Sequence, residues 1–173
     1  YLRQLVEEAI SGTPYNGYEN EYMLRGTALE PQARGTYEKF SRNCVREVGL
    51  VYLDSNRRVS ASPDGLIEEN GGLEIKCPIP KTHCVYLKGS TAPSKYRAQI
   101  QGNLWITGRK WWDFVSYTPE MPTGERMIIH RVERDDVYIE MLQNEILGFV
   151  HDMDKILEES EMKTPMRGVL KIV

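Results

Sequence analysis

The chain has 173 residues, of which 40% are hydrophobic and 27% charged, and its formal net charge is -3. This balance is ordinary for one soluble globular domain and does not indicate a generic basic nucleic-acid-binding protein, although charge can still be segregated locally. No run approaches the roughly 18 apolar residues of a membrane helix, and no signal peptide is visible. The three cysteines lack zinc or iron–sulfur spacing, so we expect reduced thiols and a cytoplasmic location.

Hydrophobic periodicity predicts alternating helices and strands. In chain order, the predicted elements are helices at 1–10 and 19–41, strands at 45–53, 59–67 and 73–77, a short helix or turn around 82–87, a helix at 94–106, strands at 111–117 and 127–133, and a helix at 135–158. Ser94 is the expected N-cap of its helix. Helices flanking one mixed sheet of about five strands predict an α/β fold. We expect a single domain over 1–173, in which the tail 160–173 has no assigned structure.

The most informative pattern is Asp64, nine intervening residues, and then Glu74-Ile75-Lys76. The intervening residues are typical of a strand end, a Gly-rich turn and the start of the next strand, and this hairpin would bring Asp64 close to Glu74. Both carboxylates can offer hard oxygen ligands to Mg²⁺. Lys76 returns to the face of Glu74 and can stabilise negative charge on an attacking water, whereas Ile75 faces the core. The pattern predicts a metal-dependent phosphodiesterase, and the competing interpretation is a surface hairpin with solvated charges.

Three further polar residues could add to this site. Glu30, on the second predicted helix, would supply a third carboxylate one turn after Gly26, which would let a ligand come close. Gln99 and Gln101 could orient a water or hold a phosphate, but they point about 200° apart on a helix and cannot both face one site. Without other information, a helix-surface Glu and surface Gln side chains are the competing interpretations.

The aromatic and basic residues allow two interpretations each. Three tryptophans could stack on bases, but we expect them to pack the sheet against the helix at 94–106; they are Trp105, Trp111 and Trp112. An acidic protein can track along DNA only if its charges are segregated, so some basic residues would have to line a channel. The candidates for that channel are Lys88, Lys95, Arg97 and Arg109.

Together these residues resemble the phage lambda exonuclease family, the YqaJ-type viral recombinase nucleases of the restriction-endonuclease-like superfamily. The matching motifs keep the family's order over roughly residues 1–158 and are Arg25-Gly26-x-x-x-Glu30, Ser62-Pro63-Asp64-Gly65-Leu66, Gly72-Leu73-Glu74-Ile75-Lys76-Cys77-Pro78, Tyr96-x-Ala98-Gln99-Ile100-Gln101 and Trp112-Asp113-Phe114-x-x-Tyr117. The pairing of the second and third motifs is highly specific. The resemblance implies a PD-(D/E)xK core, with a central mixed sheet flanked by helices.

The resemblance also implies a role for each residue of the predicted metal site. Asp64, Glu74 and the main-chain carbonyl of Ile75 are implied to be metal ligands, and Glu30 the outer metal- or water-binding carboxylate. Lys76 is implied to activate or stabilise the nucleophilic water. The implied cofactor is Mg²⁺, replaceable by Mn²⁺, with a pair of ions in each site.

The substrate and assembly expected from the resemblance are more specific still. Ser62 and Gln99 match residues that help to hold the terminal 5′-phosphate of a double-stranded DNA end. The resemblance implies a ring-shaped homotrimer that degrades the 5′-ended strand processively. The remaining 3′ strand would be bound by a single-strand-annealing protein in the bacterial host. The gene would then be of phage or prophage origin. The family's N-terminal stretch, which also grips the 5′-phosphate, has no match in these residues.

Two other interpretations remain open from the residues alone. A site-specific or structure-specific endonuclease could use the same core, and a helicase-associated iron–sulfur nuclease is disfavoured because four ligating cysteines are lacking. A catalytically silent DNA-end-binding module is the alternative from a different functional class. The combination of Glu30, Asp64, Glu74 and Lys76 argues against that module.

Overall fold

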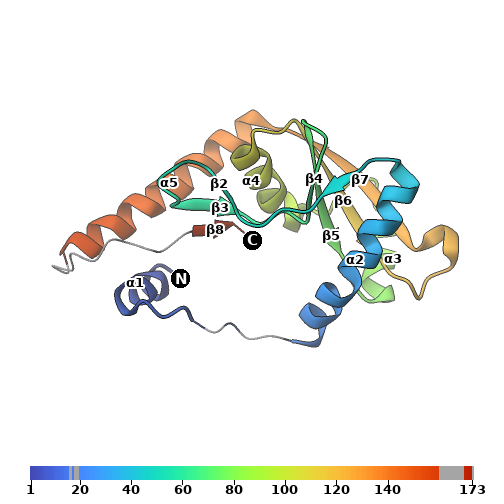
Figure 1. The fold of residues 1–173 in the computed structure, drawn as a ribbon, viewed down its shortest axis with the longest axis horizontal. Coiled ribbons are helices and arrows are strands. Elements are labelled where there is room, and N and C mark those ends of the chain that lie inside the picture. The colour runs from blue at the N-terminus through green and yellow to red at the C-terminus, as the bar shows by residue number, and fades with distance from the viewer. Residues whose placement is uncertain (16, 18–19, 160–169, 173) are drawn as a thin grey trace.

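A five-stranded mixed sheet forms the centre of the molecule (Figure 1). The structure is a computed structural model that describes residues 1–15, 17, 20–159 and 170–172. The strand order is β1-β4-β5-β6-β7, and neighbouring strands are antiparallel except β5 and β6, which are parallel. Their bounds are Val45–Arg46, Gly65–Ile67, Gly71–Lys76, Trp111–Tyr117 and Met127–Glu133. The expected mixed sheet is therefore present, with β5 at its centre.

Helices cover both faces of this sheet, as Figure 1 shows for α2 and α4. On one face, α2 (Glu21–Ser41) packs Tyr37 into a core that contains Ile75 of β5. On the other face, α4 and α5 form a second core around Phe114 of β6. A parallel strand pair needs a crossover connection, and α3 and α4 supply it between β5 and β6. The bounds of the remaining helices are Leu2–Ser11 for α1, Pro80–Leu87 for α3, Arg97–Thr107 for α4 and Asp136–Glu159 for α5.

Two glycines are required where β5 pairs with β6. Gly71 lies opposite Trp111 and Gly72 opposite Trp112, and a Cβ atom on either glycine would lie within 2.2 Å of an indole ring. Trp105 and Trp112 pack on the α4 side of the sheet, as expected. The expectation for Trp111 was wrong, because successive side chains on a strand alternate and Trp111 packs against the opposite core.

A second, smaller sheet lies beside the first and has the strand order β2-β3-β8. Its strands are short, with the bounds Val51–Tyr52, Val59–Ala61 and Leu170–Ile172. The parallel pairing of β3 with β8 assigns a structure to part of the tail 160–173, for which the sequence predicted none. Residues 160–169 and 173 lie outside the described residues. On α1, Val6 packs against α5.

Two predicted strands are wrong in the same way, because each is split between the two sheets. The segment 45–53 forms β1 and β2, and the segment 59–67 forms β3 and β4. Pro63 cannot donate a hydrogen bond to a strand ladder, so the chain leaves the small sheet after Ala61 and enters the main sheet at Gly65. Asp64 therefore lies in the loop before β4, and not on a central strand as expected.

The helix ends differ from the expected ones by a few residues. Asn20 caps α2 by accepting hydrogen bonds from the N–H groups of Tyr22 and Met23, and the expected first residue of this helix, Glu19, lies outside the described residues. Ser94 is not a cap: it begins a 3₁₀ turn over Ser94–Tyr96, which precedes α4. Within the described part of the chain, no helix is both long and apolar enough to cross a membrane.

Candidate active site

Strand β5 brings Glu74 and Lys76 to the same side of the sheet. Glu74 is only 1% exposed, and its Oε1 atom lies 2.6 Å from Nζ of Lys76. The same oxygen accepts a hydrogen bond of 2.9 Å from Nε2 of Gln99, on α4. The other carboxylate oxygen, Oε2, is buried without a hydrogen-bond partner among the described residues. Such an unsatisfied buried oxygen is rare and costly, which indicates a site for a missing partner.

The β4–β5 hairpin carries Asp64 to Glu74, as the spacing predicted. Leu66 pairs with Gly72 across the two strands, and Asp64 lies directly before the first of them. Oδ2 of Asp64 accepts a hydrogen bond of 2.6 Å from the N–H group of Ile75. Ile75 itself is 6% exposed and faces the α2 core, as expected. The hairpin thus fixes Asp64 against the strand that carries Glu74.

Arg34 connects Glu30 to the same loop. Arg34 is 8% exposed and forms an ion pair with Glu30, one turn earlier on α2. Its Nε atom donates to the main-chain oxygen of Asp64 at 3.2 Å, and Nη1 lies 2.9 Å from Glu47. Sequence reasoning did not find Arg34, although its position four residues after Glu30 was a usable signal. The guanidinium group therefore connects the Glu30 carboxylate to the backbone of Asp64.

Asp64 and Glu74 both resist ionisation. Burial raises the pKa of Asp64 to about 7, and repulsion from Glu74 and Glu30 adds to this effect, whereas the Ile75 N–H and Lys76 oppose it. Burial also raises the pKa of Glu74, against the opposing attraction of Lys76. Burial lowers the pKa of Lys76, but the attraction and hydrogen bond of Glu74, together with the attraction of Asp64, raise it above its ordinary value. Buried carboxylates of this kind are stabilised as anions by a divalent cation.

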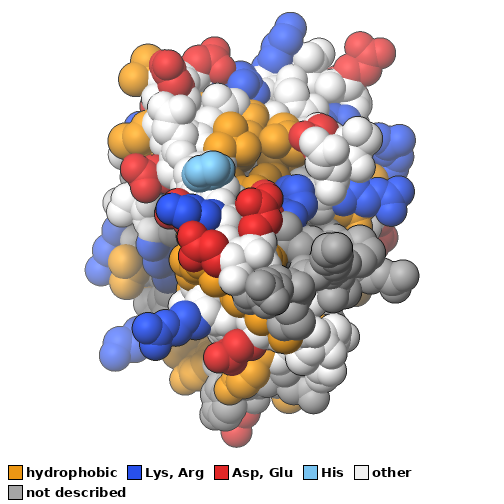
Figure 2. Space-filling model, turned by 90° about the vertical axis from the view of Figure 1, so that its left-hand side faces the viewer, with side chains coloured by type: hydrophobic (Ala, Val, Ile, Leu, Met, Phe, Trp, Pro, Cys, Tyr) orange, Lys and Arg blue, Asp and Glu red, His pale blue; other side chains and the backbone are white. Residues whose placement is uncertain are grey.

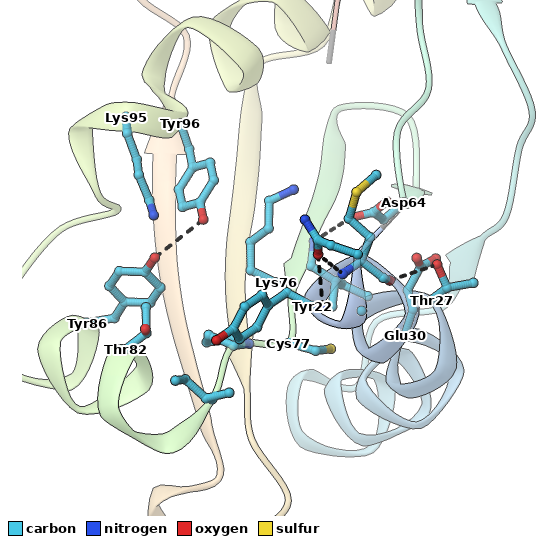
Figure 3. Close-up of a pocket in the computed structure, with 16 residues that line it drawn as sticks. Tyr22, Thr27, Glu30, Asp64, Lys76, Cys77, Thr82, Tyr86, Lys95 and Tyr96 are labelled. Carbon is cyan, nitrogen blue, oxygen red and sulfur yellow. Dashed lines mark hydrogen bonds between the residues drawn. The ribbon is translucent and has the colours of Figure 1, made fainter. Parts of the chain in front are cut away.

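Glu30, Asp64 and Lys76 line an open pocket of about 620 Å³ (Figure 3), and the buried Glu74 is not among the described residues that line it. Lys76 lies between the Glu30 and Asp64 side of the pocket and a wall that contains Tyr86, Lys95 and Tyr96. A Cβ atom on Gly26 would meet no described atom within 4 Å, and this glycine lines the pocket. The space beside Gly26 is therefore open to a ligand and is not filled by another segment.

The residues present suit a divalent metal ion, although they do not form a complete metal cage. Among the described residues, no group of three or more His, Cys, Asp and Glu side chains is placed to hold a metal. Oε1 of Glu74 is engaged by Lys76 and Gln99, and Oδ2 of Asp64 by the Ile75 N–H. The unpartnered Oε2 of Glu74 and the raised pKa of Asp64 are the two observations that fit a hard cation.

Gln99 and Gln101 point to different places, as their spacing predicted. Gln99 donates to Glu74, whereas Gln101 donates to the main-chain oxygen of Glu133 and accepts from the N–H of Asp135. Ser62 is partly buried in the loop before Asp64, and it is not among the described residues that line the pocket. Gln99 thus has a contact inside the site, and Gln101 stabilises the link between β7 and α5.

The expected basic channel is only partly supported. Arg109 is 8% exposed, and its Nη1 atom donates to three main-chain oxygens, of Ile67, Glu68 and Gly71, so its assignment to a channel was wrong. Arg97 pairs with Asp135 at 2.8 Å. On the face drawn in Figure 2, the described acidic and basic side chains are interspersed. Of the four candidates, Lys95 lines the active-site pocket.

Comparisons with known proteins agree with this geometry. The chain is similar to an alkaline exonuclease (LHK-Exo) from Laribacter hongkongensis, with 35% sequence identity and a TM-score of 0.86. The similarity covers 93% of this chain and 81% of LHK-Exo. A structure of LHK-Exo in complex with dAMP matches equally well, with 93% and 82% of the two chains covered. The fold also resembles that of a phage-related exonuclease from Haemophilus somnus 129PT, with 15% identity, coverage of 92% and 82%, and a TM-score of 0.70.

Sequence comparison leads to the same group of proteins. The chain is 34% identical over 68 residues to ExoD of Escherichia coli strain K12, a stretch that covers 38% of this chain and 75% of ExoD. The family model of the YqaJ-like viral recombinase domain matches residues 1–110. The predictions of the family, the fold and an enzyme of the exonuclease kind are confirmed by these similarities. The chain therefore belongs to the family of YqaJ-like viral recombinase domains.

Proposed function

We propose that this protein is a Mg²⁺-dependent exonuclease that degrades the 5′-ended strand of double-stranded DNA. The observation that carries the proposal is the buried Glu74 carboxylate, with one oxygen held by Lys76 and the other without a partner among the described residues. Similarity to an alkaline exonuclease that was solved in complex with dAMP supports a DNA substrate. The dAMP ligand fits release of mononucleotides.

In this proposal, Asp64, Glu74, the Ile75 carbonyl and Glu30 hold Mg²⁺, or Mn²⁺ in its place, and a pair of ions occupies the site. Bound Mg²⁺ would supply Lewis-acid polarisation of the phosphate and a more acidic water. Lys76 stabilises negative charge on that water and on the phosphate oxygens, because its ammonium group is already held at the site by Glu74.

The other residues of the site keep these groups in place. Gln99 fixes the orientation of the Glu74 carboxylate by its hydrogen bond to Oε1. Ser62 and Gln99 are proposed to hold the terminal 5′-phosphate, as neutral donors suited to an anion that is also close to metal ions. This capture would make the enzyme act from a 5′ end rather than within a strand.

The proposed biological role is DNA recombination by single-strand annealing in the bacterial cytoplasm, with a gene of phage or prophage origin. The remaining 3′ strand would pass to an annealing protein. We propose a homotrimeric ring, since a closed head-to-tail assembly would keep DNA from escaping between successive cuts. Analytical sedimentation should then give three times the monomer mass, and degradation should continue for many nucleotides after a competitor trap is added.

One assay tests the proposed activity. Linear duplexes, labelled at one end and carrying either a 5′-phosphate or a 5′-hydroxyl, are incubated with the protein in Mg²⁺ and in EDTA, beside a covalently closed circle. We expect loss of the 5′-ended strand in Mg²⁺ only, faster with the phosphate, and an intact circle. Cleavage of the circle would identify an endonuclease and contradict the proposal, as would activity in EDTA.

A further inference from the structure

The pocket wall that faces Glu30 and Asp64 contains a lysine that lies beside two tyrosines (Figure 3). We refer to Tyr86, Lys95 and Tyr96 as the tyrosine–lysine wall. The two hydroxyl oxygens are 3.3 Å apart, and Nζ of Lys95 lies 5.5 Å from the ring centroid of Tyr86 and 4.8 Å from that of Tyr96. Cation–π attraction to two rings restrains the lysine head at the edge of the pocket.

The tyrosine rings are not available for stacking on a DNA base. The Tyr96 ring stacks on Phe114 at a centroid distance of 5.1 Å, and the Tyr86 ring meets Phe114 edge-on at 6.0 Å. The ammonium groups of both Lys76 and Lys95 also lie over the Tyr96 ring. What this wall can offer a ligand is therefore its polar atoms rather than an open aromatic face.

Those polar atoms are hydrogen-bond donors, and one of them, Nζ of Lys95, carries a positive charge. Two hydroxyl groups that share one hydrogen bond leave one O–H free to donate, and the Lys95 ammonium group, which also interacts with both hydroxyls, has three donors in all. Lys76 is neutralised by Glu74, but within the described part of the chain no ion pair joins Lys95 to a carboxylate. The chemistry of the wall matches an anion, and a phosphate group in particular.

We propose that the tyrosine–lysine wall binds the phosphodiester next to the scissile one along the DNA strand, with Lys95 as its counter-charge. This inference rests on the proposed nuclease function, because it assumes that the scissile phosphate lies between Lys76 and the carboxylates. Lys76 and Lys95 lie against the same ring, so an adjacent phosphate can meet the second lysine. The acidic side of the pocket, with Glu30 and Asp64, repels any phosphate whose charge is not neutralised by a metal ion. The phosphate next to the scissile one is therefore expected on the basic side, at Lys95.

The test measures DNA binding without cleavage. The full chain with D64N, and the same chain with D64N and K95A, bind a fluorescent duplex in EDTA over a series of KCl concentrations. Loss of one phosphate contact should weaken binding about tenfold at 0.1 M salt. It should also reduce the magnitude of the slope of log K against log [KCl] by about 0.7–1. K95R keeps the charge and should keep the slope.

Lys155 supplies a matched control, because it is an exposed lysine on α5 that does not line the pocket. K155A should leave the slope within error of D64N alone. With the catalytic residues intact, K95A should raise KM for DNA with little change in kcat, since this contact is made before and during the reaction. Inhibition by dAMP should not change.

Each contrary result identifies what failed. A slope that K95A does not alter, in a protein that still degrades DNA ends in Mg²⁺, overturns the phosphate subsite and leaves the proposed function intact. An equal change with K155A also overturns it, because the effect would then be general surface charge. Weaker dAMP inhibition with an unchanged DNA slope would assign the wall to the released nucleotide instead. If the unsubstituted chain neither binds nor degrades DNA, the proposed function itself is wrong.

Discussion

The ammonium nitrogen of Lys76 lies 2.6 Å from Oε1 of Glu74, while Oε2 of the same carboxylate has no hydrogen-bond partner within the described residues. A structural ion pair would use both oxygens, because an unsatisfied buried oxygen costs stability. The arrangement is instead suited to a ligand that binds Oε2 and keeps Lys76 at its side. Mutations that alter one of these interactions at a time can separate metal binding, catalysis and folding.

D64N should abolish both metal binding and hydrolysis, and should stabilise the metal-free fold. The pKa of Asp64 is about 7 in the folded chain, against about 4 in an unfolded chain. The folded chain therefore binds more protons in this range, and it loses stability as the pH rises from about 4 to 7. At pH 8 in EDTA, D64N should melt above wild type, by roughly 2–4 °C for each kcal/mol of repulsion removed. Mg²⁺ should raise the melting temperature of wild type only.

E74Q should likewise lose hydrolysis by orders of magnitude while remaining folded. Wild-type activity in either variant would exclude these residues as metal ligands.

K76A should retain Mg²⁺ binding and lose turnover. Lys76 is proposed to stabilise charge that develops in the reaction, and removal of one such preorganised group costs about 10²–10³ in rate. Calorimetry with Mg²⁺ would measure binding, and single-turnover degradation of an end-labelled duplex would measure the chemical step. Loss of metal binding in K76A would show that Lys76 is needed to maintain the site rather than to act in the reaction.

R34K should weaken Mg²⁺ binding because the single ammonium group cannot hold Glu30 and the Asp64 main-chain oxygen together. Groups that orient metal ligands typically change affinity by about 10–100-fold when substituted. Metal affinity by calorimetry is the direct measurement. E47Q is the control, since Glu47 pairs with the same arginine but its side chain is 71% exposed, so it should change affinity little. Equal effects of both variants would contradict a specific positioning role for Arg34.

S62A and Q99A should distinguish two roles for Gln99. If both residues hold the terminal 5′-phosphate, each variant should reduce the preference for 5′-phosphorylated over 5′-hydroxyl duplexes, with a larger loss in the double variant. If Gln99 only orients Glu74, Q99A should slow both substrates by the same factor. Initial rates on the two substrates give the ratio directly. An unchanged ratio in the double variant would contradict the assignment of a phosphate pocket to these residues.

The stability of the fold should fall at alkaline pH, in part through Tyr37. Burial raises the pKa of Tyr37 to about 12, and its hydroxyl donates to Oδ2 of Asp113 at 2.7 Å. An unfolded tyrosine titrates near 10, so the folded chain binds more protons between pH 10 and 12 and loses stability as the pH rises through this window. The loss should be on the order of 2 kcal/mol. Urea unfolding from pH 9 to 12 should show a shallower decline for Y37F, and parallel declines would contradict the assignment.

The sequence by itself determined the β4–β5 hairpin that brings Asp64 to the strand of Glu74. Alternation along β5 places Glu74 and Lys76 on one face and Ile75 on the other, and the short turn after β4 lets that strand pair with β5. These are local relationships, set by a repeat of two residues and by turn chemistry. The boundaries of β6 and β7 were also predicted, because each segment forms one uninterrupted strand within a single sheet.

Only the tertiary structure decided which segments share a sheet and which polar groups meet. Periodicity cannot show that 45–53 and 59–67 are each divided between two sheets, because the division depends on distant partners such as β8. Arg34 reaches Asp64 across 30 residues, and Arg109 is buried by the carbonyl groups of the β4–β5 turn, although the sequence gives both the appearance of surface charges. Packing that joins remote segments fixes the burial and partners of each charged group, and these determine whether it binds a ligand or stabilises the fold.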